Sequence, residues 1–345
     1  MHSAHRQNNF NLIRLVLALL VILSHSPCLI DGNGDAREPL MQVFGTLSLG
    51  ELAVDGFFLL SGYLIMQSWV SQPQAWPFLK KRALRIYPGF IVACLVSAFI
   101  VGPLGADPAV YFNAFDMTAF VKGLLFLNIP AVPAVFAGTH YDIVNGSMWT
   151  ICKEFSCYLL VLAAGVTGAL RWRHFCLAAA TGVFLSFAWL KFKFEPAGDL
   201  RLATFFLSGA CYYVYRDQIR FKGVALGAAG VFVAFFMFSG RGAELALASA
   251  GGYLLLFVAG KRSALLSRFN RLPDVSYGVY LYGWPIQKLL LWYYPSMSPW
   301  TLFALSAPAS IVCGIASWYL VEKPALRFKG PSLQVATQER EPVPT

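Results

Sequence analysis

The sequence contains few charged residues. Only 13% of its 345 residues are Asp, Glu, Lys or Arg, whereas a soluble domain has about 25%. Hydrophobic residues make up 57% of the chain, and the mean hydropathy is +0.59. This number of charges is too small to cover the surface of a water-soluble protein of this length. The composition therefore excludes the soluble classes of protein. We therefore expect the lipid bilayer, and no nucleic acid, as a partner, although the net charge is +10.

The sequence also lacks the cysteine and histidine spacing of a metal site. The seven cysteines are odd in number, are scattered over the apolar runs and form no CxxC pair, so they predict neither a disulfide framework nor a zinc site. We expect no bound metal and no permanently bound cofactor.

Long apolar runs occur along nearly the whole chain. A helical span needs about 20 apolar residues, and eleven stretches approach this length. They are residues 10–31, 47–70, 86–104, 118–136, 147–170, 174–190, 200–215, 223–240, 243–260, 274–294 and 300–320. Transmembrane barrels show shorter, alternating segments. The runs therefore predict an all-α, polytopic membrane helix bundle.

The positive charges decide which runs cross the membrane. The stretch 118–136 is interrupted by Pro130 and Pro133, which break a helix. If it does not cross, 18 of the 27 lysines and arginines fall on the cytoplasmic side and five outside, as the positive-inside rule requires. We predict about ten spans, cytoplasmic termini, and a re-entrant or surface-lying segment at 118–136. Residues 1–328 would form the membrane domain and 329–345 a disordered cytoplasmic tail.

Ionisable residues inside predicted spans indicate where function lies, because they are costly in a bilayer. Arg14 and His25 are eleven residues apart in the first run, so they share one helix face and lie about 16 Å apart along its axis. Counting from the outer ends of their spans places His25, Asp55 and Glu154 at similar depths. A histidine oriented by a carboxylate suits general-base catalysis.

Other interpretations of these residues stay open at this point. His25 could form only a hydrogen bond across the bundle, and Asp55 or Glu154 could only neutralise Arg14 or Lys153. A proton-coupled transporter or exporter without acyl-transfer chemistry would use the same groups.

Five motifs in order resemble the membrane acyltransferase-3 family of integral membrane O-acyltransferases. They are NLIRLVLALLVILSHS (11–26), VDGFFLLSGYLI (54–65), FLKKRALRIYP (78–88), NGSMWTICKEFSCYLL (145–160), and VSYGVYLYGWPIQ (275–287) followed by YLVEKPA (319–325). Two departures stand out. Gly283 occupies a position where many members have histidine, and the SGNH hydrolase-like domain fused to some members is not expected beyond Pro324.

The resemblance implies transfer of an acyl group, usually acetyl, from cytoplasmic acyl-CoA to a hydroxyl of a lipid-linked or surface saccharide at the bacterial inner membrane. Arg82 and Arg85, in a basic loop, would hold CoA phosphates, and Arg14 would meet the pyrophosphate or the thioester carbonyl. His25 would act as general base or acyl-carrying nucleophile.

The resemblance also implies roles for other residues of these motifs. Asp55 or Glu154 would orient the His25 ring. Trp149, Ser61 and Tyr87 are the expected substrate-binding residues.

Overall fold

The structure, a computed structural model, describes residues 9–32, 37–261 and 273–329, and within these ranges the chain is helical with no strand. The predicted tail at 329–345 therefore lies outside the described residues except for Lys329. The helices are α1 (Phe10–Asp31), α2 (Pro39–Phe44), α3 (Leu49–Ser71), α4 (Ala75–Val96), α5 (Gly102–Leu104), α6 (Pro108–Asn113), α7 (Met117–Leu125), α8 (Trp149–Val166), α9 (Arg173–Lys193), α10 (Gly198–Val214), α11 (Gly223–Phe236), α12 (Ala243–Ala246), α13 (Gly252–Gly260), α15 (Ser276–Tyr293), α16 (Pro299–Ser317) and α17 (Lys323–Leu326).

Seven helical runs are long and apolar enough to cross a membrane. They are Phe10–Asp31, Leu49–Ser71, Ala75–Leu104, Gly146–Val166, Arg173–Lys193, Ala243–Gly260 and Pro299–Lys329. Helices α10, α11 and α15 correspond to the other three predicted spans but are not among these seven. The all-helical membrane bundle is thus confirmed, whereas the count of ten spans stays a prediction.

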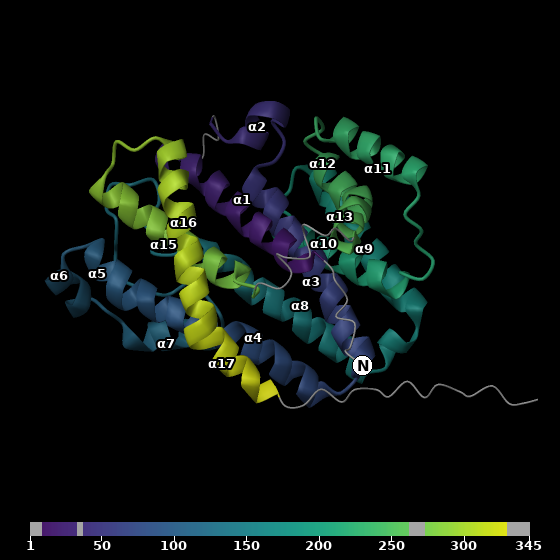
Figure 1. Cartoon of the computed structure of the whole chain (residues 1–345), viewed down its shortest axis with the longest axis horizontal. Helices are drawn as coiled ribbons and strands as arrows, with labels where there is room; N and C mark the ends of the chain where they lie inside the picture. The colour runs from purple at the N-terminus through teal and green to yellow at the C-terminus, as the bar shows by residue number, and fades with distance from the viewer. Residues whose placement is uncertain (1–8, 33–36, 262–272, 330–345) are drawn as a thin grey trace, which may run out of the picture.

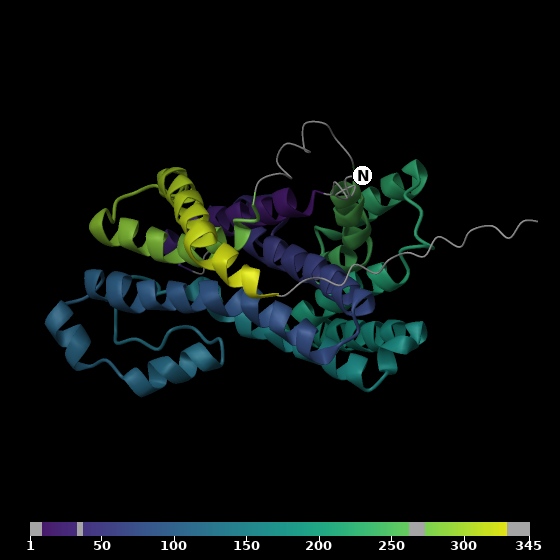
Figure 2. The same ribbon diagram turned by 60° about the horizontal axis from the view of Figure 1, so that its bottom comes forward.

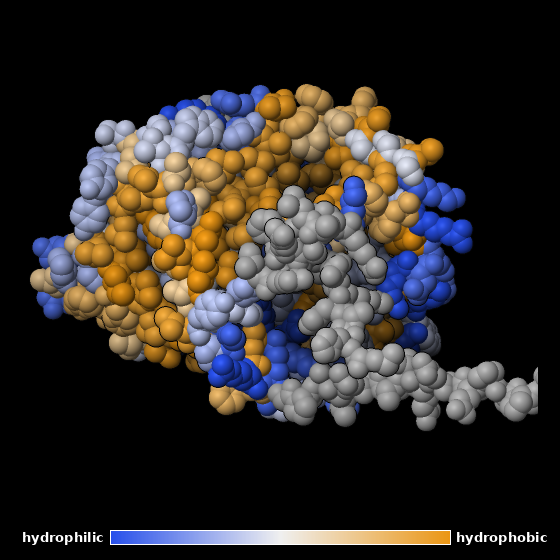
Figure 3. All heavy atoms as spheres, viewed as in Figure 1, coloured by the Kyte–Doolittle hydropathy of each residue, from blue (hydrophilic) through white to orange (hydrophobic). Residues whose placement is uncertain are grey.

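The exposed surface fits a protein surrounded by lipid. Large apolar side chains such as Leu160, Val224 and Leu320 are 67%, 89% and 77% exposed. Apolar atoms cover much of the face in Figure 3, and hydrophilic residues gather toward its edges. Such wide apolar exposure would be unfavourable in water, and the chain is an integral membrane protein.

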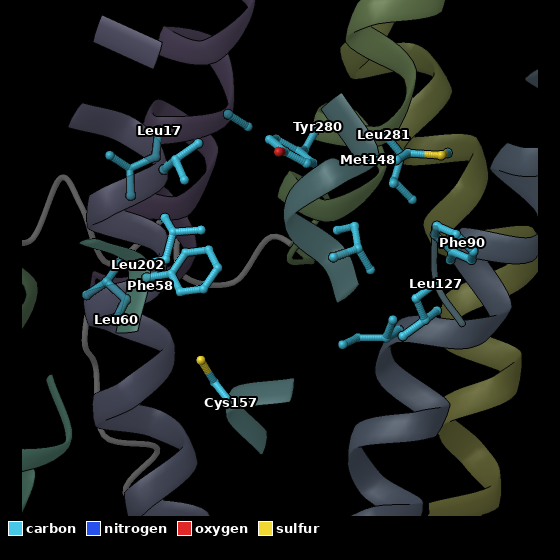
Figure 4. Close-up of a cluster of buried hydrophobic side chains, with 14 of the residues drawn as sticks. Leu17, Phe58, Leu60, Phe90, Leu127, Met148, Cys157, Leu202, Tyr280 and Leu281 are labelled. Carbon is cyan, nitrogen blue, oxygen red and sulfur yellow. The ribbon is translucent and has the colours of Figure 1, made fainter. Parts of the chain in front are cut away.

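The bundle is held together by close packing of α3 against α10. A Cβ on Gly62 would lie 1.8 Å from the carbonyl oxygen of Phe206, and one on Gly209 would lie 1.9 Å from that of Leu59. These two glycines allow the helix backbones to touch, which is how small residues stabilise helix pairs in membranes. The buried core then extends from Leu17, Phe58 and Leu60 to Met148 and Leu281, as Figure 4 shows.

Residues 118–136 do not form a spanning helix. Helix α7 ends at Leu125, and the chain then has no regular helix until Gly146. The short helices α5, α6 and α7 gather at one end of the molecule, opposite α11, α12 and α13 (Figures 1 and 2).

The end of the irregular segment that follows α7 enters the bundle. Three side chains of α15, each one turn from the next, bind this segment. Lys288 donates to the Thr139 hydroxyl at 2.7 Å, Trp284 Nε1 to the Ile143 carbonyl at 3.1 Å, and the Tyr280 hydroxyl to the Ser147 carbonyl at 2.6 Å. Asn145, Ser147 and Met148 are almost fully buried. The chain therefore enters the bundle at 139–148, after the segment 118–136 that was expected to do so, and the first turn of α8 lies beside the N-terminal half of α15.

Candidate active site

A cavity of about 230 Å³ lies between α1, α3, α4, α8 and α15. Its charged and polar lining comes from distant parts of the sequence. These residues are Arg14, Arg82, Arg85, Thr150, Glu154, Tyr158, Ser276, Tyr277, Tyr280 and Lys329. The apolar part of the wall comes largely from α3, through residues such as Phe57 and Phe58. The cavity thus has the mixed apolar and polar lining of a ligand site.

Arg82 and Arg85 lie within α4 and not in a loop. The helix begins at Ala75 and continues through both arginines, so their i, i+3 spacing places both on one face. Both line the cavity. The expectation of a basic loop is wrong, because the charged residues form part of helix α4 and do not interrupt it. The side chains of both arginines point into the cavity.

Arg14 and Arg85 are bound by carboxylates. Asp274, two residues before α15, accepts from Arg14 at 3.0 Å and from Arg85 at 2.7 Å. Glu322 accepts from the other Nη atom of Arg85 at 3.1 Å. Burial raises the pKa of Asp274, but the charges of Arg85 and Arg14 outweigh it and hold that pKa below its usual value.

Arg82 has a different environment. Among the described residues no carboxylate lies within 4.0 Å of it, and its buried Nε has no hydrogen-bond partner. Its guanidinium lies 5.9 Å from the centre of the Phe78 ring. Arg82 thus keeps hydrogen-bond donors for a ligand in the cavity.

Glu154 is part of a hydrogen-bonded group at the cavity wall. The Ser61 hydroxyl donates to Glu154 at 2.8 Å, and the Tyr158 hydroxyl donates to the same oxygen. One turn earlier on α8, Thr150 and the Tyr280 hydroxyl are 2.8 Å apart. Glu154 therefore lies at the level of Arg14, and the prediction that it shares the depth of His25 is wrong. The depth was counted from an outer surface, but α8 starts inside the bundle.

His25 lies outside this cavity, three turns along α1 from Arg14. Its ring meets Trp284 edge to face, with centroids 5.0 Å apart. The buried Nδ1 has no hydrogen-bond partner within the structure described. The expected orienting carboxylate is therefore not in contact with the ring, and Trp284 occupies one side of it.

Asp55 belongs to a separate ionic cluster. Its carboxylate lies 3.5 Å from Arg201, which also binds Glu51 at 3.1 Å and Glu244 at 3.3 Å. Lys191 pairs with Glu244 as well. The predicted approach of Asp55 to His25 is wrong, because the guanidinium of Arg201 holds Asp55 on the α10 side of α3.

The three expected substrate-binding residues have different surroundings. Ser61 binds Glu154, as described above. The Tyr87 hydroxyl donates to the Leu125 carbonyl at 2.9 Å, and Trp149 is 41% exposed. Tyr87 and Trp149 are not among the residues that line the cavity, so their substrate-binding role stays a prediction.

Sequence reasoning missed Tyr158 and Lys329 at the cavity and Asp274 as the partner of its arginines, and gave Glu322 no role. Glu322 and Tyr158 lie in motifs already noted, YLVEKPA and NGSMWTICKEFSCYLL, which was a usable signal. Asp274 had a weaker signal, an Asp just before a helix, where its Oδ1 accepts from the Ser276 backbone at 3.3 Å. Nothing local marked Lys329. Within the described ranges, no three His, Cys, Asp or Glu side chains are grouped closely enough to hold a metal ion.

Comparisons with known proteins agree over nearly the whole chain. A family model described as an acyltransferase domain matches residues 7–319. The O-acetyl transferase of Shigella phage Sf6 is 26% identical over 351 residues, covering 96% of this chain and 99% of the relative. Nodulation protein 10 of Rhizobium leguminosarum bv. viciae is 26% identical over 368 residues, covering 95% of each. No solved structure matches the chain. The chain therefore belongs to the acyltransferase-3 family and is a membrane O-acyltransferase.

Proposed function

We propose that the protein transfers an acetyl group from acetyl-CoA to a hydroxyl of a cell-envelope saccharide or glycolipid at the bacterial inner membrane. The observation that carries this proposal is a cavity lined by three arginines and a lysine, with His25 three turns away on the same helix as Arg14. The name of the phage relative, O-acetyl transferase, favours acetyl as the group transferred.

The cavity suits the phosphate-bearing part of CoA. Arginine binds phosphate through two parallel hydrogen bonds, and Arg82 has unused donors there. Arg14 and Arg85 are engaged by Asp274. We therefore assign the first contact with phosphate to Arg82, and to Arg14 and Arg85 a positive field that attracts the donor.

His25 is the proposed base or acyl carrier. Arg14 and His25 are separated by about 16 Å along α1, and CoA carries its thioester at the end of a long pantetheine arm. A donor bound by its phosphates in the cavity would thus extend its acyl carbon toward His25. In the base mechanism, the imidazole takes the hydroxyl proton of the acceptor, the new O–C bond forms, and the C–S bond breaks. The CoA sulfur leaves with the electron pair and takes a proton.

Glu154 and Asp55 have different places in this proposal. Glu154, bound to Ser61 and Tyr158 at the cavity wall, would act near the donor and not on the His25 ring. Asp55, paired with Arg201, would stabilise the fold around α3.

The proposed topology has ten spans with both termini in the cytoplasm, which puts the cavity arginines on the acyl-CoA side. In a protein free of other cysteines, Pro108→Cys should react with an impermeant thiol reagent from outside, and Leu265→Cys should not. The reverse labelling would contradict the assignment of donor and acceptor sides. A transporter without acyl-transfer chemistry is not favoured, because the family is one of acyltransferases.

The reaction itself is tested with acetyl-CoA radiolabelled on the acetyl group and an envelope glycolipid fraction. Purified protein should release free CoA and leave the label on the lipid. No turnover with any acceptor fraction would refute the proposal. Mass spectrometry of envelope glycans, with and without the protein in the cell, would identify the acceptor.

The role of His25 is tested by two variants. His25→Ala and His25→Gln should both lower transfer by at least about 100-fold, because neither side chain can take a proton. His174→Gln, at an exposed position early in α9, is the matched control and should keep full activity. Substantial transfer by His25→Gln would instead show that His25 only forms a hydrogen bond across the bundle.

A further inference from the structure

We infer that Lys329 and Arg82 together form an anion site that holds a phosphate of the acyl donor in the cavity. This inference rests on the proposed function and adds a donor-binding residue to it. Lys329 lies beyond residue 319, where the match to the family model ends.

The four cations of the cavity differ in their partners. Arg14 and Arg85 share Asp274, and Arg85 also binds Glu322. Within the described part of the chain, neither Arg82 nor Lys329 has a carboxylate within 4.0 Å, although both line the same cavity. The cavity therefore has one pair of cations in contact with carboxylates and one pair without such a contact among the described residues.

The C-terminal helical run explains how Lys329 reaches this place. It continues from Pro299 to Lys329 for 31 residues, more than the roughly 20 that a span requires. Its last turns, α17 and the 3₁₀ turn Arg327–Lys329, pack against α4. Figure 1 shows α17 lying beside α4. Because the run extends beyond the length of a span, its last residue, Lys329, lies beside α4, the helix that contains Arg82.

Lys329 also lies within electrostatic reach of Arg82, Arg85 and Lys81. Like charges that lie close together in a partly buried place repel one another. A bound dianion would attract each of these cations and so offset the repulsion between them. The two side chains without a carboxylate contact in the described ranges are complementary: arginine provides a planar pair of donors, and lysine provides a compact point charge. A phosphate or pyrophosphate group is the ligand class that both recognise.

The experiment measures binding of two probes, coenzyme A and pantetheine, to the purified full-length protein by calorimetry. Lys329→Ala should weaken coenzyme A binding by roughly tenfold and leave pantetheine binding unchanged, because pantetheine has no phosphate. The matched control is Lys323→Ala in the same helical run, where the ammonium lies 5.0 Å from the centre of the Tyr319 ring. It should bind both probes like the wild type.

Two outcomes separate this inference from the proposed function. If the wild type binds coenzyme A and Lys329→Ala binds it equally well, the anion site is refuted and the proposed donor stands. If the wild type does not bind coenzyme A, the proposed donor is refuted, and inorganic pyrophosphate then tests the site. Pyrophosphate binding that Lys329→Ala weakens would support the site for another phosphate-bearing ligand, and its absence would refute the site too.

Discussion

Two charged clusters of this bundle have opposite balances. The cavity is lined by four cations, Arg14, Arg82, Arg85 and Lys329, and by one acid, Glu154, while two further acids, Asp274 and Glu322, bind Arg14 and Arg85. The Arg201 cluster brings Arg201 and Lys191 together with the three acids Glu51, Asp55 and Glu244. The first has more cations than acids and borders open space, whereas the second has more acids than cations.

The difference indicates which charges bind a ligand and which hold the fold. Arg201 and Asp55 are only 8% and 1% exposed, and each has its counter-charge from a neighbouring helix. Removing one partner of such a buried group leaves an uncompensated charge, which costs about 3–5 kcal/mol. In the cavity, Arg82 and Lys329 have no carboxylate of the described residues within 4.0 Å and border open space. A variant should therefore affect stability in one cluster and donor affinity in the other.

The largest effect is expected for Arg201→Met. It should lower the free energy of unfolding by about 3–5 kcal/mol, because buried Asp55 and Glu244 lose their shared cation. The measurement is thermal unfolding in detergent. Adding Glu244→Gln should recover part of the loss by removing one of the stranded acids.

Arg37→Met is the control for Arg201→Met. Arg37 pairs with Asp31 at an exposed position, where its side chain is 44% accessible, and solvent screens such pairs so that they add little to stability. Equal destabilisation by the two variants would contradict a structural role specific to the Arg201 cluster.

Arg82→Met should have the next largest effect, on affinity and not on folding. Loss of one charge-assisted hydrogen bond to the donor corresponds to about 1.5–3 kcal/mol, and the KM for acetyl-CoA should rise roughly 10–100-fold. The KM for the acceptor and the melting temperature should change little. Arg85→Met should differ by lowering the melting temperature, because Asp274 and Glu322 lose a partner. Equal behaviour of the two arginines would remove the distinction between paired and unpaired cations.

Asp274→Asn tests the paired half of the cavity. At neutral pH the variant should be less stable by about 1–3 kcal/mol, because a charged acceptor is lost to Arg14 and Arg85. The folded-state pKa of Asp274 lies below its usual value, so its contribution is complete above the unfolded pKa and fades as pH falls through the folded pKa. The stability difference between wild type and variant should therefore shrink below about pH 4. A difference that is constant with pH would show that the carboxylate charge is not what stabilises this position.

The smallest effect is expected for Trp284→Phe. This substitution changes no charge, so its loss of stability is the reference for the charge-removing variants. It removes the hydrogen bond to the Ile143 carbonyl and keeps an aromatic ring beside His25. The expected loss is about 0.5–1.5 kcal/mol in thermal unfolding. A loss as large as that of Arg201→Met would mean that the entering segment, and not ionic pairing, dominates stability.

Much of the fold follows from local sequence, whereas the site does not. Apolar runs predicted the positions of α1, α3 and α9 closely, because span length is a local property. Glu154 was placed at the wrong level because α8 begins inside the bundle, and that start is fixed by hydrogen bonds from α15, more than 100 residues later. The partner of Asp55 was equally hidden, since Arg201 lies on a helix that the sequence does not show to be adjacent.

The backbone path of the segment 139–147 is fixed by hydrogen bonds from helix α15. Two non-glycine residues upstream, Leu127 and Phe136, have positive φ angles of 56° and are almost fully buried, so contacts elsewhere hold the backbone in a conformation it seldom adopts alone. Tyr280, Trp284 and Lys288 fasten the segment at four-residue intervals. One residue inserted into α15 between these positions would turn the later side chains by about 100° and release the segment, although no residue of the segment itself had changed. The spacing of these three side chains along α15 thus determines the conformation of the segment. Among relatives, changes in the length of the segment should be limited to those that keep its contacts with α15.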